Sequence, residues 1–180
     1  MTRAVSKSLR QFLSAYAPEI ADIYLKTRQT VLAKAPHANE LIYDAYNALS
    51  CVYSFTENMK QGFIHIAAYP NHVNLGFNQG ASLEDPDSLL LGHGSHIRHI
   101  KIGHGGIIHR NATLTLIESA VMQGKRMQAA NPGATPSFSA TLVKSVSENK
   151  RRPWTAQPSR LSTLSRHRRH QDLNCAAAHG

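Results

Sequence analysis

Cysteine and long apolar runs are both scarce in this 180-residue sequence. Its two cysteines, Cys51 and Cys175, are too few for a disulfide framework and lack the spacing of metal ligands. No run of about 18 consecutive apolar residues occurs, so the sequence predicts no transmembrane helix and no membrane partner. The first twenty residues lack the apolar segment and cleavage site of a secretory signal. We therefore expect a cytoplasmic protein, in a compartment that keeps thiols reduced.

The motifs of several common enzyme classes are also missing. The sequence contains no G-x-S-x-G nucleophile elbow and no G-x-x-x-x-G-K-[ST] phosphate loop. No G-x-G-x-x-G string follows a predicted strand, and no convincing pair of nucleophile and base is found. The sequence therefore favours a protein that is not an enzyme.

Acidic residues are few, and the excess of basic residues is unevenly distributed. The net charge is +9, of which residues 1–130 carry +3 and residues 131–180 carry +6. The second part begins with Asn-Pro-Gly-Ala-Thr-Pro-Ser and continues rich in Ser, Thr, Arg and His. This composition predicts a domain at 1–130 and a basic, mostly disordered tail at 131–180. Arginine clusters near Trp154, within residues 150–169, give nucleic-acid binding through the tail as one hypothesis.

Apolar spacing in the first part predicts helices at both ends and strands between them. Pro18 and Glu19 suit the first turn of a helix, and Asp85 followed by Pro86 suits the start of another. The predicted helices are 9–16, 18–35, 39–47, 85–92 and 111–128, and the predicted strands are 50–55, 63–69, 72–77 and 96–102. Consecutive hairpins indicate antiparallel pairing. The predicted fold class is α+β, with an antiparallel β-sheet flanked by N-terminal and C-terminal helices.

One long motif carries a family resemblance. The run HVNLGFNQGASLEDPDSLLLGHGSHIRHIKI, preceded by ELIYDAYNAL and FIHIAAYP, resembles the YdhG-like family, also called DUF1801, over residues 5–130. The resemblance implies a small bacterial-type α+β domain, and some members of the family are described as frataxin-like iron chaperones. Two positions depart from the family pattern: Ser95 stands where a lysine is usual, and Leu91 where an acid is frequent.

The segment 73–78 presents an unusual polar face. Strand alternation places Asn74, Gly76 and Asn78 together, although Asn and Gly are poor strand formers. One interpretation is the wall of a polar pocket, where a ligand or another backbone approaches Gly76. The other interpretation is a solvated face with a bulge at the sheet edge.

Arg98 and His99 lie in the predicted fourth strand, and His99 belongs to the family pattern. Arg98 either forms an ion pair with Asp85, tying the Asp-Pro turn to the sheet, or captures an anionic ligand. The ion pair is the favoured interpretation. The candidate ligand-binding residues are thus Asn74, Gly76, Asn78, Asp85, Arg98 and His99.

Iron handling would require a cluster of metal ligands. Glu19 and Asp22 are three residues apart on a predicted helix, and Glu40 and Asp44 are four apart on another. His96 lies in a run of five histidines between residues 93 and 109. The candidate metal residues are Glu19, Asp22 and His96, although solvated surface acids are the more common explanation of such pairs. The predicted function is a YdhG-like binding domain, for which the family resemblance implies frataxin-like iron handling, and the alternative is a metal-free anion- or metabolite-binding module.

Overall fold

The computed structural model describes residues 3–103, 105–131 and 139–150. Three helices occur in this part of the chain: α1 (Lys7–Leu13), α2 (Pro18–Lys34) and α3 (Asn111–Ala129). Ser6 caps α1 by accepting a hydrogen bond from the Leu9 N–H at 3.2 Å, and Pro18 occupies the first turn of α2, where a missing N–H costs nothing. The helices predicted at 9–16, 18–35 and 111–128 are confirmed as α1, α2 and α3.

The six strands form one sheet in the order β5-β4-β3-β2-β1-β6. They are β1 (Asn39–Asp44), β2 (Leu49–Ser54), β3 (Gly62–Tyr69), β4 (His72–Phe77), β5 (Arg98–Ile102) and β6 (Thr141–Val146). The neighbours from β1 to β5 pair antiparallel, whereas β6 pairs parallel with β1. Short 3₁₀ turns lie at Met59–Gln61 (η1), Gly80–Ser82 (η2) and Gly105–His109 (η3). The predicted α+β class is confirmed.

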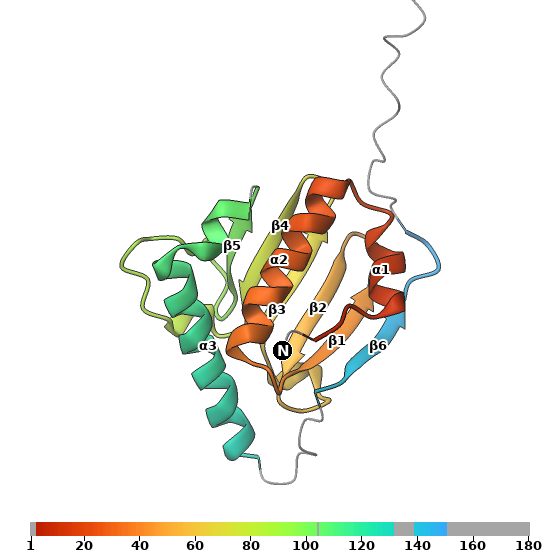
Figure 1. The fold of residues 1–180 in the computed structure, drawn as a ribbon. Helices are drawn as coiled ribbons and strands as arrows, with labels where there is room; N and C mark the ends of the chain where they lie inside the picture. Colours follow the sequence, from red (N-terminus) through yellow and green to blue (C-terminus); the bar gives the residue numbers. More distant parts are fainter. Residues whose placement is uncertain (1–2, 104, 132–138, 151–180) are drawn as a thin grey trace, which may run out of the picture.

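The helices pack on one face of the sheet, as Figure 1 shows for α1 and α2. A register row on that face joins five buried side chains of the core, namely Ile42, Cys51, Ile66, Leu75 and Ile100. The same core contains the inward side chains of the helices, such as Leu9, Tyr24 and Ile117. Because side chains alternate along a strand, the residues next to this row point to the other face.

That second face carries no helix among the described residues, and we call it the helix-free face. It includes two neighbouring register rows: Leu41, Val52, His65, Gly76 and His99 in one, and Tyr43, Ser50, Ala67, Asn74 and Lys101 in the other. Leu41, Val52 and Ala67 are buried here although they do not belong to the helix-side core. The histidines of these rows, with Asn74 and Lys101, lie on β3, β4 and β5.

Three sequence predictions about the elements are wrong. Residues 39–44 form a strand rather than the start of a helix, and residues 85–92 form no helix. Residues 141–146 form a strand beside β1, so the packed structure extends beyond Ala130, where the predicted domain ended. Contacts with distant parts of the chain explain the strands at 39–44 and 141–146, whereas residues 85–92 are held by a local turn and by pairing with the edge of β5.

The segment after η2 illustrates this. The carboxylate of Asp85 accepts hydrogen bonds from the N–H groups of Leu89 at 3.0 Å and Leu90 at 2.7 Å, so it closes a local turn. Leu91 then pairs with His99 in an isolated antiparallel bridge, through N–H to C=O bonds of 2.8 and 3.0 Å. Pairing with the edge of β5 therefore competes successfully with a helix.

Candidate functional site

The centre of the helix-free face is a row of three residues in neighbouring strands. His65 in β3 lies opposite Gly76 in β4, and Gly76 lies opposite His99 in β5. Two imidazoles thus flank a glycine on one surface. Gly76 and His99 are among the ligand-binding residues predicted from the sequence, whereas His65 is not; His65 lies between Gly76 and the buried Val52.

A chain of hydrogen bonds fixes the orientation of the His65 ring. Its Nδ1 lies 2.8 Å from Oδ1 of Asn78, and Nδ2 of Asn78 donates to the Gly62 carbonyl at 2.8 Å. Because a carbonyl only accepts, the NH₂ group of Asn78 must face Gly62 and its Oδ1 must face His65. His65 therefore carries its proton on Nδ1 when neutral, and its Nε2 presents a lone pair.

Gly76 makes room for that ring. A Cβ atom at position 76 would lie 2.1 Å from both Cε1 and Nε2 of His65, which is far inside van der Waals contact. The Cε1–Nε2 edge therefore lies directly over Gly76. This close approach explains a glycine in mid-strand, and the group that approaches is a side chain of the protein rather than a ligand or a backbone.

The electrostatics of the face favour neutral imidazoles. Burial lowers the pKa of His65; the hydrogen bond with Asn78 opposes this shift, and the nearby His99 adds to it. Burial also lowers the pKa of His72, and the charges of Lys101 and His99 lower it further. His99 is thus within electrostatic reach of both other histidines. At neutral pH the face offers ring nitrogens that can accept hydrogen bonds.

Asn74 adds a second acceptor to the same face. It lies between Ala67 of β3 and Lys101 of β5, two residues from Gly76. Its Oδ1 is buried and has no hydrogen-bond partner. A buried acceptor without a partner costs about 1–3 kcal/mol, so native proteins rarely keep one without a reason. At the rim of the face, His72 stacks on Tyr69 with ring centroids 4.8 Å apart.

Two of the predicted ligand-binding residues serve the fold instead. The guanidinium of Arg98 donates to the carbonyls of Gly94 and Ile97, and the carboxylate of Asp85 is occupied by Leu89 and Leu90. No ion pair between Asp85 and Arg98 occurs in this described part of the chain, so the predicted pairing is wrong. Arg98 holds the loop that precedes β5.

The predicted metal residues do not form a cluster. Glu19 and Asp22 lie on α2, where Asp22 pairs with Lys26 at 2.8 Å, and His96 is exposed in the loop before β5. Within residues 3–103, 105–131 and 139–150, no group of three or more His, Cys, Asp or Glu side chains could hold a metal ion. Iron binding therefore gains no preformed site from these three residues.

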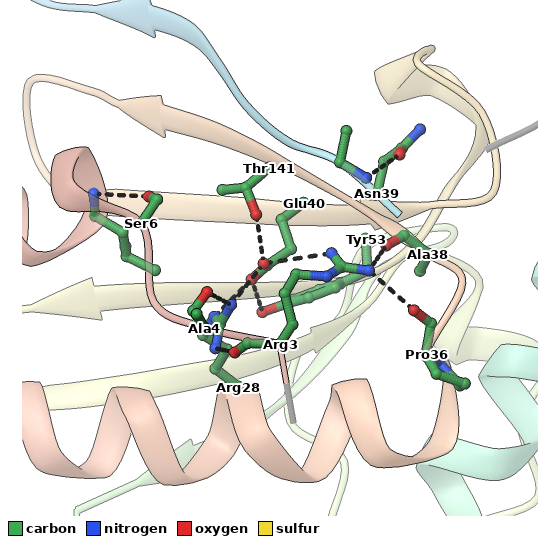
Figure 2. Close-up of polar contacts among 12 residues, drawn as sticks. Arg3, Ala4, Ser6, Arg28, Pro36, Ala38, Asn39, Glu40, Tyr53 and Thr141 are labelled. Atoms are coloured by element: carbon green, nitrogen blue, oxygen red, sulfur yellow. Dashed lines mark hydrogen bonds and ion pairs between the residues drawn. The ribbon is translucent and has the colours of Figure 1, made fainter. Parts of the chain in front are cut away.

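A buried polar network lies on the helix side of the sheet, and no pattern in the sequence predicts it. The spacing of Glu40 and Asp44 predicts a helix surface, whereas Glu40 is completely buried in β1. Figure 2 shows its carboxylate accepting two bonds from Arg28, one from Thr141 and one from Tyr53, with Arg3 at 3.4 Å. The main-chain carbonyls of Arg3 and Ala4 accept the other hydrogen bonds of Arg28. This network fastens the N-terminal segment, α2, β1 and β6 to one another.

The hypothesis of nucleic-acid binding concerns residues 150–169, of which the structure describes Lys150 alone. Among the described residues, no helix has both the length and the apolar character needed to cross a bilayer.

The sequence matches no protein-family model, no curated protein and no solved structure with which it was compared. The similarity to the YdhG-like family therefore stays a prediction that depends on the motif residues.

Proposed function

We propose that this protein is a binding domain rather than an enzyme, and that its ligand site is the helix-free face around His65, Asn74 and His99. The observation that carries the proposal is the Gly62–Asn78–His65 chain of hydrogen bonds. It holds an imidazole with its Nε2 lone pair over Gly76, on the same face as the unpartnered Oδ1 of Asn74. The face thus contains two acceptors, the oriented Nε2 of His65 and the buried, unpartnered Oδ1 of Asn74.

Two acceptors favour a ligand that donates hydrogen bonds. An uncharged planar molecule with N–H or O–H groups would satisfy Nε2 of His65 and Oδ1 of Asn74 together. The stacked rings of Tyr69 and His72 at the rim offer a flat aromatic surface on which a planar ligand could stack. The exposed Lys101 beside Asn74 disfavours a cation at this position. The ligand class that fits is a small, neutral, planar hydrogen-bond donor.

Iron handling remains the prediction that the family resemblance supplies. Its candidate ligands Glu19, Asp22 and His96 are not gathered in the structure, and His65 and His99 alone would leave most coordination positions to water. We therefore expect weak Fe(II) binding, at about micromolar affinity or worse. The metal-free module is the stronger proposal.

A titration followed by NMR tests the proposal on the full chain. The probes are adenine, cytosine and nicotinamide, added with and without a chelator. We expect amide shifts that centre on residues 65, 74 and 99 and that do not change when the chelator is present. The Asn74→Leu variant removes an unsatisfied buried acceptor, so it should stay folded while binding weakens at least about tenfold. The matched control is Asp22→Asn on α2, which should bind as the parent does.

Shifts confined to other surfaces, or equal affinity in the Asn74→Leu variant, would contradict this location of the site. Binding that requires Fe(II) and disappears with the chelator would support the iron hypothesis instead.

A further inference from the structure

Strand β6 is attached to the sheet in an unusual way. None of its side chains belongs to the buried core, and Val143 and Val146 are 43% and 51% exposed. Its partner in the sheet is β1, with which it pairs in parallel along the sheet edge. The strand is therefore held by backbone pairing and polar contacts rather than by apolar burial, which is the way a bound peptide is held.

The backbone contacts hold this segment at both ends. Glu40 N–H donates to the Ala140 carbonyl at 2.8 Å, and Oδ1 of Asn39 accepts from Ala140 N–H at 3.0 Å. At the other end, Ser147 N–H donates to the Asp44 carbonyl at 2.8 Å. Because main-chain groups make these bonds in the docked segment, any extended peptide without proline at an inward position could make them.

Acidic side chains then select which peptide fits. The hydroxyl of Thr141 donates to Oε2 of Glu40 at 2.9 Å (Figure 2), and Nζ of Lys144 lies 3.3 Å from Oε2 of Glu57. Lys150 pairs with Asp44, and its Nζ lies 5.4 Å above the centre of the Phe12 ring. Three carboxylates thus recognise a hydroxyl and two ammonium groups at fixed positions of one extended segment.

We propose that the edge of β1 is a strand-addition site for an extended basic segment of another protein, and that residues 140–150 occupy this site as an internal competitor. The recognised pattern is a Ser or Thr opposite Glu40, a Lys three residues later and a Lys nine residues later. Charge complementarity between this pattern and Glu40, Glu57 and Asp44 defines the partner. This edge is separate from the proposed ligand site around His65, Asn74 and His99 on β3 to β5, so the inference does not depend on that site.

Glu40 gives the first position its selectivity. The carboxylate is fully buried and receives Arg28 donors at 2.8 Å on each oxygen, and the Thr141 hydroxyl supplies a further donor to Oε2. A valine at this position would remove one hydrogen bond to Oε2, which would keep its contacts with Arg28 and Arg3. The hydroxyl group therefore adds one side-chain contact to the backbone pairing, and the two lysines supply the others.

The covalent connection makes the internal segment a strong competitor. A segment joined by a short connection has an effective concentration of about a millimolar, so a free peptide must overcome this occupancy. Weakening the internal segment should therefore increase the apparent affinity for a peptide supplied from outside. The site itself is unchanged by a substitution in β6.

Two proline variants of the full chain separate these effects. In a parallel pair of strands, the N–H and C=O groups of every second residue face the neighbouring strand, and those of the residues between them face away. Since the Ala140 carbonyl faces Glu40, the N–H of Leu142 faces β1 and that of Val143 points away. Leu142→Pro removes a bond between β6 and β1, whereas Val143→Pro removes an outward donor and is the matched control.

The probe is a fluorescent peptide with the sequence of residues 139–150, titrated by anisotropy against each protein. We expect Leu142→Pro to bind it at least about tenfold more tightly than the parent chain. Val143→Pro should bind like the parent. A peptide carrying Thr141→Val, Lys144→Glu and Lys150→Glu should lose binding. Circular dichroism checks folding, and a full chain with Lys144→Glu and Lys150→Glu replaces Leu142→Pro if that variant is unfolded.

The proposal is overturned if a folded variant with a weakened internal segment ignores the peptide, or if a scrambled peptide binds equally well. A parent dimer that excess peptide converts to monomer would show that the occupant is a second copy exchanging β6, which also overturns the assignment to another protein. Failure of the nucleobase titration on the helix-free face would leave this result unaffected.

Discussion

The guanidinium of Arg28 in α2 and the carboxylate of Glu40 in β1 form a bidentate ion pair in the protein interior. The distances from Nε to Oε1 and from Nη2 to Oε2 are both 2.8 Å. The side chains are 3% and 0% exposed, so neither charge can be solvated if its partner is lost. This pair joins α2 to the sheet. It also holds in place the carboxylate that accepts a hydrogen bond from Thr141 of β6.

Breaking this pair should be costly, whereas replacing both partners should not cost twice as much. We expect Glu40→Gln and Arg28→Met each to lower the free energy of unfolding by about 3–5 kcal/mol, because each leaves an uncompensated group in the interior. The double variant should lose clearly less than the sum of the two losses. Urea unfolding of the three variants measures the coupling.

The exposed pair of Asp22 and Lys26 provides the comparison for this experiment. Its side chains are 58% and 52% exposed, so Asp22→Asn should change stability by about 0–1 kcal/mol. Additive losses for Arg28 and Glu40 would mean that the two residues do not stabilise the fold as a pair.

His65 should make stability depend on pH in a defined direction. Burial lowers its pKa in the folded state, while an unfolded histidine titrates near about 6.5. Between the lowered pKa and about 6.5 the unfolded chain binds more protons. The contribution of His65 is therefore complete above about pH 6.5 and is lost as the pH falls toward the folded-state pKa.

The His65→Asn variant tests this because its amide keeps a donor near Asn78 and cannot titrate. We expect the loss of unfolding free energy between about pH 7.5 and about pH 5.5 to be smaller in the variant than in the parent. Equal losses in the two proteins would assign the pH dependence to other groups.

Gly76→Ala should destabilise the protein through His65. The new methyl group would overlap the Cε1–Nε2 edge of a ring that Asn78 holds in place, so the ring or the strand must move. We expect a loss of about 1–3 kcal/mol, measured by thermal or urea unfolding. In a His65→Ala background the same substitution should cost much less. An equal cost in both backgrounds would show that the backbone, and not the ring, requires glycine.

Gly124→Ala should be destabilising although alanine favours a helix. Replacing a helical glycine by alanine gains about 1 kcal/mol from propensity. A Cβ at position 124 would, however, lie 2.5 Å from Cδ1 of Phe63, a buried ring stacked on Phe55 at 4.8 Å. Overpacking should exceed the propensity gain, so the melting temperature should fall. Phe63→Leu should relieve the effect, and a more stable Gly124→Ala protein would contradict this packing argument.

Local patterns in the sequence determined much of the fold. Apolar periodicity with Pro18 and Glu19 predicted α2, and the alternation along 73–78 placed Asn74 and Gly76 on one face, because pleating fixes that relation in any strand. The same alternation could not identify His65 as the group over Gly76. A glycine in mid-strand indicates a close approach, but the identity of the approaching group depends on the register between β3 and β4.

Only the tertiary structure decided the conformation of residues 39–44, 85–92 and 141–146. The buried charge of Glu40 is compensated by Arg28 of α2. Its four-residue spacing from Asp44 therefore did not indicate a helix, because both residues lie in β1. Leu91 pairs with His99, and Thr141 pairs with Glu40 about one hundred residues earlier in the chain. Caps, turns and alternation are set by neighbours in sequence, whereas strand pairing and the compensation of buried charges require partners that the chain brings together only when it folds.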